Sequence, residues 1–297
     1  MTEPLICVVG SINEDTTIRV PVLPAAGETA LATGRTRSGG GKGANQAAAA
    51  AAMGARVAFV GAVGDDDAGR LALESLESRS IDVSHVSSHP LSATGTAVIL
   101  VGDDGENLIV VDQGANALLD ASTVRAAVEQ LAPAVTLGQL EVPIDCLAAA
   151  AEATGAGVFL LNPAPMSDDP SELDEVLAMA DVVMPNRSEL GRLARRATPL
   201  TAAEVDACVA VLDVKGAVVV TLGSQGAVVY DQGHRTEVAA LSVDAVDTSG
   251  AGDVFCGVLA HRLASGDELV AAVRRANTSA ARSTTLAGAQ VPADFTG

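Results

Sequence analysis

The stretch that decides the fold reads Val246-Asp247-Thr248-Ser249-Gly250-Ala251-Gly252-Asp253-Val254-Phe255. Its turn of small residues runs directly into an apolar segment that predicts a helix over Asp253–Ala264. Free backbone amides at the start of a helix, together with the helix dipole, form a site for an anion. The carboxylate of Asp253 would repel that anion, unless it faces an attacking group while the glycine amides face a phosphate. Such an arrangement is typical of phosphoryl transfer, although an ordinary tight turn followed by a favourable first-turn charge has the same sequence.

Composition and charge narrow the class of protein. With 297 residues, 48% of them hydrophobic, the chain can form one large α/β domain or two small ones. The formal net charge of −19 argues against nucleic acid or an anionic membrane as a partner. No stretch has the length and apolar character of a membrane span, and Met1–Pro4 lacks the basic region that begins a signal peptide. The four cysteines stand far apart without a CxxC motif, which indicates free thiols in a reducing compartment, so we expect a cytoplasmic protein.

Short apolar runs alternate with helical patterns along most of the chain. Strands are expected at Leu5–Val9, Arg56–Val60, Val135–Leu140, Val158–Leu161, Asp181–Met184 and Ala217–Thr221, with Gly226–Tyr230 as a late antiparallel partner. Helices are expected at Asn45–Met53, Asp67–Ser78, Ile144–Ala153, Ser171–Ala180, Thr201–Leu212 and Leu269–Thr284. This alternation predicts a mostly parallel sheet that is covered by helices on both faces.

Two β-rich segments, 11–41 and 92–113, interrupt that alternation. The second contains the hairpin signal Gly102-Asp103-Asp104-Gly105 between two apolar runs. These segments predict a small separate sheet over the face where ligands bind. In an open α/β sheet that face lies outside the carboxyl ends of the strands.

The glycine-rich segment Gly39-Gly40-Gly41-Lys42-Gly43-Ala44-Asn45-Gln46 precedes a predicted helix. It formally fits the G-x-G-x-x-A pattern, but no acidic residue ends the following strand, which disfavours a dinucleotide site and an NAD-dependent oxidoreductase. It is not a P-loop either, because Gly43 follows Lys42 where that motif has Ser or Thr. The segment indicates a loop on which a polyhydroxylated ligand lies against the backbone, with Lys42 and Asn45 supplying hydrogen bonds. A glycine-rich turn that caps a helix is the alternative.

Polar residues follow two other predicted strands. Asn13 and Asp15 stand two apart after Leu5–Val9, so in an extended segment they point the same way and suit the hydroxyls of a neutral sugar. Glu141 ends the run Val135–Leu140 and can reach the same crevice. The alternatives are ordinary polar loop residues and, for Glu141, a charge at a helix start.

Two further motifs suit a nucleotide. Asn186 and Glu189 lie on one helical face, which indicates either a capping box or an outer-shell site for Mg²⁺ and phosphate. The segment Thr221–Gly226 joins two strands, either as a plain hairpin or as a wall of a nucleotide pocket.

Taken together, these motifs resemble the ribokinase/PfkB carbohydrate kinase family from Ile6 to about Pro292. The matching pieces occur in family order: Gly10-Ser11-Ile12-Asn13 with Asp15, Gly40 to Gln46, Gln139-Leu140-Glu141, Asn162-Pro163-Ala164-Pro165, Pro185-Asn186 with Glu189, Thr221-Leu222-Gly223-Ser224, Asp247 to Asp253 and Gly288-Ala289-Gln290. The resemblance implies a three-layer α/β/α fold with a mostly parallel central sheet and a small β-sheet lid. Residues 1–10, 42–91 and 114–297 would form the core, and residues 11–41 and 92–113 the lid, which commonly builds a homodimer.

The resemblance also implies roles for individual residues. Asp253 would be the catalytic base, and Gly250, Ala251 and Gly252 would form the anion hole. The sugar would be held, together with Asp253, by Asn13, Asp15, Gly41, Lys42, Asn45 and Glu141. ATP would be bordered by Asn186, Thr221, Gly223, Ser224, Gly226, Gly252 and Asn277.

Two metal ions follow from the same resemblance. Glu189 would organise Mg²⁺ through water, and Asp247 with the backbone of Ser249 would help to bind an activating monovalent cation, usually K⁺. Few residues follow Gly288-Ala289-Gln290. The resemblance implies that residues just past this motif help to close the cation loop and that family members continue into another helix. This sequence departs from the family pattern there.

The loop around Lys42 is similar to that of family members that act on D-ribose, so the resemblance implies D-ribose as the substrate, phosphorylated at O5 by ATP. Deoxyribose, another sugar or a nucleoside are alternatives within the same family. A catalytically silent sugar- or nucleotide-binding regulator on the same fold is a further alternative, which the intact Asp253 and glycine turn disfavour.

Overall fold

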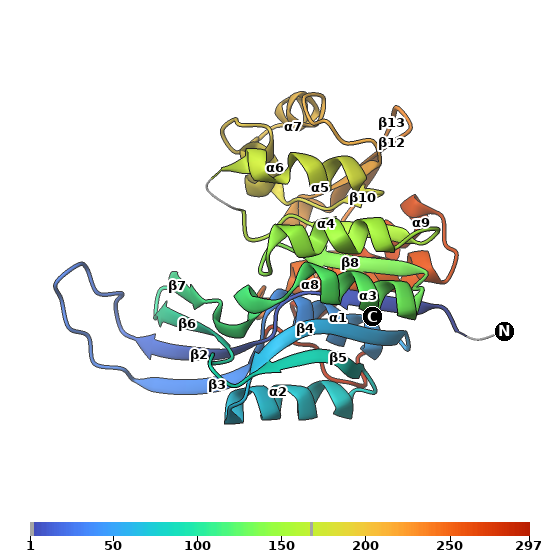
Figure 1. The fold of residues 1–297 in the computed structure, drawn as a ribbon. Coiled ribbons are helices and arrows are strands. Elements are labelled where there is room, and N and C mark those ends of the chain that lie inside the picture. The colour runs from blue at the N-terminus through green and yellow to red at the C-terminus, as the bar shows by residue number, and fades with distance from the viewer. Residues whose placement is uncertain (1–2, 167–168) are drawn as a thin grey trace.

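The computed structural model describes residues 3–166 and 169–297 (Figure 1). Residues 1, 2, 167 and 168 of the expected core lie outside the described residues. The strands are β1 (Leu5–Val9), β2 (Asn13–Val20), β3 (Gly34–Gly40), β4 (Arg56–Gly64), β5 (Asp82–His89), β6 (Gly95–Gly102), β7 (Asn107–Asp112), β8 (Val135–Gln139), β9 (Val158–Asn162), β10 (Val182–Val183), β11 (Ala217–Thr221), β12 (Ala227–Asp231) and β13 (His234–Val238). The α-helices are α1 (Lys42–Ala52), α2 (Asp67–Ser78), α3 (Ala121–Leu131), α4 (Ile144–Ala153), α5 (Asp174–Met179), α6 (Arg187–Leu193), α7 (Ala202–Val209), α8 (Ala251–Ala264) and α9 (Leu269–Ser283).

The larger sheet is mostly parallel, as the alternation of strands and helices predicts. Within the described residues its strand order is β13-β12-β11-β10-β9-β8-β1-β4-β5, and only β11–β12 and β12–β13 pair antiparallel. Strand β1 is the third strand from the β5 edge, with β4 on one side and β8 on the other, both parallel to it. The chain runs from β1 through β4 to β5 in one direction, then resumes at β8 and continues in the other direction through β9, β10 and β11. The strand order thus reverses between β1 and β8, which creates the switch point where such sheets bind ligands.

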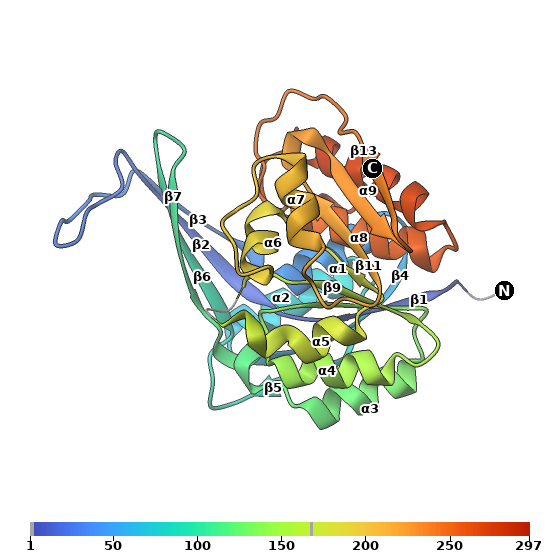
Figure 2. The ribbon, with the colours of Figure 1, turned by 90° about the horizontal axis from the view of Figure 1, so that it is seen from above.

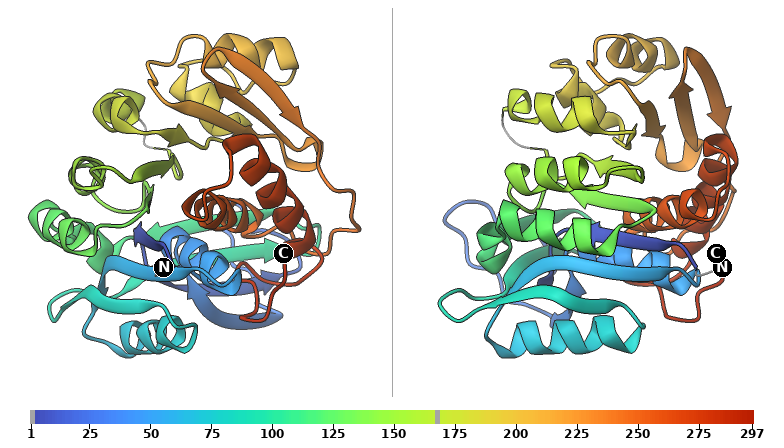
Figure 3. Two further views of the ribbon diagram at one scale, coloured as in Figure 1. Left: turned by 90° about the vertical axis from the view of Figure 1, so that its right-hand side faces the viewer. Right: turned by 45° about the vertical axis from the view of Figure 1, so that its right-hand side comes forward.

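Helices cover both faces of this sheet, because its inner strands are apolar on both sides. Ile6 and Val8 of β1 pack in one core cluster, with side chains of α1, α8 and α9, and Cys7 and Val9 pack in a second, with α3, α4 and α5. Figure 3 shows the sheet between these two groups of helices. The predicted three-layer fold is therefore confirmed.

A second sheet stands beside the first, in the order β3-β2-β6-β7. Strand β2 pairs parallel with β6, while β2–β3 and β6–β7 pair antiparallel. All four strands fall within the segments 11–41 and 92–113, and the loops between β2 and β3 and between β6 and β7 project away from the core (Figure 2). Every residue of β7 is exposed, in contrast to the fully buried β1.

Some elements go beyond the sequence expectations. Strands β5 and β13 and helix α3 were not expected, and both α1 and α8 begin earlier than expected, at Lys42 and Ala251. Helices α1 and α8 pack closely because Gly257 has no side chain: a Cβ there would lie 2.3 Å from the carbonyl oxygen of Gln46. In the described part of the chain, no helix is both long enough and apolar enough to cross a bilayer.

Candidate active site

The predicted site residues gather where the carboxyl ends of the core strands meet the N-termini of α1 and α8. Asp253 lies in the first turn of α8 and is 7% exposed. Gly250 caps this helix in the left-handed conformation, at φ 71°, and a Cβ there would lie 2.1 Å from the carbonyl oxygen of Ala289. A Cβ on Gly252, by contrast, would meet no atom within 4 Å. The backbone at Gly252 therefore faces open space, beside amides that have no acceptor within the helix.

Neutral amide groups hold the carboxylate of Asp253. Asn45 donates through Nδ2 to Oδ2 at 3.1 Å, and Gln46 donates through Nε2 to Oδ1 at 3.0 Å. Both donors lie on α1, which explains why the close packing of α1 and α8 matters for the site. Each hydrogen bond to an ionised acceptor is stronger than one between neutral groups, so the carboxylate is fixed in orientation.

A second row of buried amides supports the first. Gln46 Nε2 also lies 3.0 Å from Oδ1 of Asn162, and Gln139 donates through Nε2 to Oε1 of Gln46 at 2.8 Å. No role is predicted from the sequence for these three side chains, although they stand in the quoted motifs. Gln46 and Gln139 are completely buried, and no local sequence signal reveals that they meet.

Some of the residues that the sequence predicts to hold a sugar lie on the second sheet and the glycine loop. In the described residues, Asp15 Oδ1 and Asn45 Oδ1 are two of the buried side-chain atoms without a hydrogen-bond partner. Burial raises the pKa of Asp15 to about 6, and the nearby carboxylates of Glu141 and Asp253 add to the shift. Gly40 is required beside Asp15, because a Cβ on Gly40 would lie 2.2 Å from that carboxyl group. The site thus contains acceptors that no protein group satisfies.

Glu141 and Asn13 are already engaged with protein groups. Glu141 Oε2 accepts from the hydroxyl of Ser11 and from the backbone amide of Lys42, the latter at 2.8 Å. Asn13 Oδ1 accepts from Nδ2 of Asn116 at 2.8 Å. Gly41 caps α1 at φ 87°, and a Cβ there would lie 2.8 Å from the carbonyl oxygen of Ser11. These contacts fix the glycine loop against the end of β1.

A cavity of about 130 Å³ extends from Asp253 toward Asn186 and Glu189. Lys42 also lines this cavity, together with Gly250 and Gly252. Burial lowers the pKa of Lys42, but the carboxylates of Asp253, Glu141 and Glu189 outweigh burial and raise it overall. A positive charge therefore stands next to the glycine turn, within a protein of net charge −19.

Asn186 and Glu189 form the capping box that the sequence allowed. Glu189 accepts from the backbone amide of Asn186 and from its Nδ2, both at 2.7 Å, and Asn186 Oδ1 accepts from the Glu189 amide at 2.9 Å. Burial raises the pKa of Glu189, against the effect of the Asn186 amide. Both carboxylate oxygens are engaged, and the described residues contain no group of three or more side chains able to hold a metal directly. The chemistry of the pair therefore fits a hydrated Mg²⁺, held through water.

A larger pocket of about 430 Å³ adjoins this cavity. Its lining includes all of the expected ATP residues except Asn186, namely Thr221, Gly223, Ser224, Gly226, Gly252 and Asn277. Thr221 and Gly252 line both spaces, so the two adjoin between the end of β11 and the start of α8. Asn277 donates through Nδ2 to the carbonyl oxygens of Val238 and Ala239, at 3.2 and 3.1 Å, which fixes α9 against that wall.

Asp247 connects the glycine turn to the segment that carries Gly288. Its Oδ1 accepts from the amide of Ser249 and its Oδ2 from the amide of Gly288, each at 2.9 Å. Burial raises the pKa of Asp247, but these hydrogen bonds outweigh it and lower the pKa overall. Each oxygen retains a lone pair that can bind a cation.

Comparisons with known proteins agree with this arrangement. Residues 3–295 match the pfkB family carbohydrate kinases. A ribokinase of Haemophilus influenzae is 36% identical over 95% of this chain and 93% of its own length, and a deoxyribokinase of Salmonella typhi is 35% identical over 96% and 94%. The structure of Arabidopsis thaliana ribokinase complexed with ribose and ATP superposes with a TM-score of 0.86 at 32% identity, over 97% of this chain and 95% of that one. The chain therefore belongs to the pfkB family of carbohydrate kinases.

Proposed function

We propose that this protein is an ATP-dependent kinase that transfers the γ-phosphoryl group to O5 of D-ribose. One observation carries the proposal. The buried carboxylate of Asp253, held by two hydrogen bonds, lies between acceptor oxygens without a protein partner and a pocket large enough for a nucleotide. The ribokinases among its relatives favour ribose as the sugar.

In the proposed reaction, O5 of ribose attacks the γ-phosphorus while its proton passes to Asp253. The bond between that phosphorus and the bridging oxygen breaks, and ADP leaves with the electron pair. The amides of Gly250, Ala251 and Gly252 stabilise the charge on the transferring group, which is the main catalytic contribution in such reactions. Mg²⁺ bound with ATP would neutralise phosphate charge, and Asn186 and Glu189 would hold it through water.

Sugar recognition would fall to Asn13, Asp15, Gly41, Asn45 and Glu141. The free oxygens of Asp15 and Asn45 would accept from ribose hydroxyls, and the glycine loop would let the ring lie against the backbone. Lys42 lines the cavity on the phosphate side, so we propose that its ammonium group also contacts the transferring phosphoryl group.

A monovalent cation would act through Asp247. A K⁺ ion bound by this carboxylate and the backbone of Ser249 would fix the shape of the glycine turn. Turnover in potassium chloride against tetramethylammonium chloride, at equal ionic strength, tests this, and equal rates would contradict it.

We also propose a core of residues 1–10, 42–91 and 114–297 and a lid of residues 11–41 and 92–113. The exposed apolar side chains of Leu108, Ile109, Val110 and Val111 on β7 would form the interface of a homodimer. Sedimentation equilibrium would show a dimer that Val110→Lys dissociates.

We propose that the protein acts in the cytoplasm, where ATP is available. All four cysteines are buried as free thiols, which agrees with a reducing compartment.

The central experiment is ATP-dependent phosphorylation of a panel of pentoses, hexoses and nucleosides. Ribose is expected to give the highest kcat/KM, and no turnover of any sugar would favour a non-catalytic binding protein instead. Deoxyribose is a second candidate, because the Salmonella typhi relative is a deoxyribokinase. A higher kcat/KM for 2-deoxyribose than for ribose would establish that alternative.

A further inference from the structure

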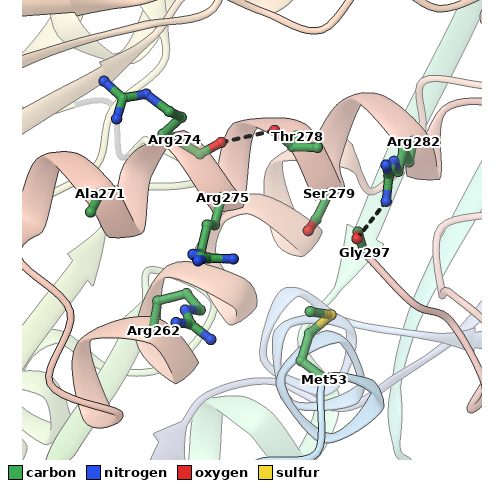
Figure 4. Close-up of a pocket in the computed structure, with 9 residues that line it drawn as sticks. All are labelled: Met53, Arg262, Ala271, Arg274, Arg275, Thr278, Ser279, Arg282 and Gly297. Carbon is green, nitrogen blue, oxygen red and sulfur yellow. Dashed lines mark hydrogen bonds between the residues drawn. The ribbon is translucent and has the colours of Figure 1, made fainter.

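A separate cavity of about 500 Å³ lies under α9, at the far end of α8 from Asp253 (Figure 4). It is bounded by Met53 after α1, Arg262 near the end of α8, and one face of α9. With a rise of about 1.5 Å per residue, the ten residues from Gly252 to Arg262 place it about 15 Å along the helix from the glycine turn. It is therefore distinct from the proposed active site.

The lining of this cavity is positively charged, in contrast to the net charge of −19 of the whole protein. Four arginines contribute to it: Arg262, Arg274, Arg275 and Arg282. Of the residues described, no Asp or Glu lines it, although the whole chain has 37 acidic residues against 18 basic ones. These guanidinium groups therefore create a local positive potential on a protein whose net charge is negative.

Nearby carboxylates neutralise only part of this charge. Asp267 Oδ2 accepts from Nε and Nη2 of Arg262, both at 2.7 Å, and lies 3.6 Å from Nε of Arg275. One carboxylate thus stands between two guanidinium groups. The side chain of Arg275 stays 65% exposed. Its remaining N–H groups are available to a ligand.

The other two arginines differ from each other. Arg282 donates through Nη1 to the carbonyl oxygen of Gly297 at 2.7 Å, which directs its guanidinium group toward the cavity (Figure 4). Arg274 is turned away from the other arginines in the same view. The positive surface of the cavity therefore comes chiefly from Arg262, Arg275 and Arg282.

The geometry points to a small polyphosphate as the ligand, and we propose that this cavity binds one carrying two or more phosphate groups. The guanidinium fork matches phosphate oxygens, and several forks exceed what a single phosphate can engage. The volume lies in the range of small-molecule sites. A nucleic acid or an anionic membrane would be repelled by the net charge of −19. A small anion in the cavity is attracted mainly by the arginines, because charges farther away than the Debye length of about 8 Å are screened.

Helix α9 connects this cavity to the nucleotide pocket, because residues of the helix line both. Arg275, Thr278 and Arg282 line the cavity under α9, while Asn277, Ala280 and Ala281 of the same helix line the nucleotide pocket. The two faces of one helix thus form walls of two sites. A ligand that shifts α9 would change nucleotide affinity, and by linkage the nucleotide would change the affinity of that ligand by the same factor.

Sodium pyrophosphate is the probe for this site, titrated by calorimetry into the full chain in metal-free buffer with saturating ADP. We expect one additional binding event, weakened about tenfold or more in Arg275→Gln/Arg282→Gln, because two charge-assisted contacts are lost. Arg70→Gln on α2 removes one positive charge from a remote surface, as Arg275→Gln alone does from the cavity, and should bind like the wild type. Equal affinity of the double variant, or equal binding of sulfate, would reduce the site to an adventitious ion only and overturn the proposal.

Two further measurements complete the test. Arg275→Gln alone disturbs only a 3.6 Å contact, so it should fold normally and still weaken binding several-fold. The affinity of ADP, measured with and without pyrophosphate, should change in the wild type and stay constant in the double variant; the same change in both would overturn the coupling through α9. These readouts are binding constants, so failure of the proposed sugar kinase activity would leave them interpretable.

Discussion

The core and the second sheet supply the site with carboxylates in different surroundings. Asp253, on the core side, accepts two hydrogen bonds from α1, whereas Asp15, on β2 of the second sheet, has a buried oxygen without a partner. The sheets differ in the same way: β1 is buried throughout and β7 is exposed throughout. We therefore predict that the core fixes the reacting carboxylate before a ligand binds, while the second sheet leaves groups free for the proposed ligand and partner.

The largest expected effect is on the core side. Asp253→Asn should lower kcat by about 10²–10⁴-fold, because the variant cannot accept the proton of O5. Binding of ribose, followed by its protection against thermal unfolding, should change little, since the amide keeps the shape of the carboxylate. A kcat within a factor of about two of the wild type would exclude Asp253 as the base.

The packing contrast between the sheets predicts the next effect. Leu137→Ala on β8 opens a cavity in a fully buried position and should reduce the free energy of unfolding by about 2–5 kcal/mol. Leu31→Ala in the loop between β2 and β3 of the second sheet, where the side chain is 84% exposed, should change it by less than about 0.5 kcal/mol. Urea unfolding of the two variants at equal protein concentration measures both values. Similar losses would mean that this loop is covered in solution.

The difference between buried and exposed strands also decides which strands can be predicted from the sequence. The inner strands are predictable because Leu5–Val9 and Ala217–Thr221 are continuous apolar runs that need burial on both faces. The edge strands β5 and β13 are not, because their sequences, DVSHVSSH and HRTEV, are polar and gain their hydrogen bonds only from a neighbour. Helix α3 did carry a signal that could have been used, with Asp120 as its N-cap and Val124 and Val128 on one face.

The candidate site divides similarly. Residues that act through a local motif, such as Asp253 and the glycine turn, can be placed from the sequence, because the helix start itself positions them. Gln46 and Gln139 cannot, since they are 93 residues apart and their hydrogen bond exists only after α1 and β8 meet. The roles of all these residues remain predictions for experiment.

Gln46→Met tests whether the second row of amides matters for the chemistry. The substitution keeps the volume but removes the donor to Asp253 and leaves Gln139 Nε2 without its acceptor. We expect kcat to fall about tenfold with KM for ATP nearly unchanged, and the protein to lose about 1–3 kcal/mol of stability. If stability fell without any change in kcat, Gln46 would be a purely structural residue.

The smallest expected effect is the pH dependence that comes from Asp15. Its pKa of about 6 in the folded protein lies above the ordinary value of 3.8, so the folded state holds the proton more tightly than the unfolded chain. Asp15 therefore lowers the free energy of unfolding progressively as the pH rises from about 4 to about 6, and its ionised form dominates above that range. Because ribose hydroxyls donate best to a carboxylate, KM for ribose should rise severalfold as the pH falls through about 6.

Asp15→Asn should remove this pH dependence of KM and relieve the stability cost above about pH 6. Glu14→Gln is the matched control, since the neighbouring side chain on β2 points to the opposite face and contacts Arg37 at 3.6 Å. Initial rates at several ribose concentrations between about pH 5 and pH 8 bracket the pKa of Asp15 and give the profile. A profile that survives in Asp15→Asn would transfer the titration to another group. The free carboxylate of the second sheet would then be a feature of the lid rather than of sugar recognition.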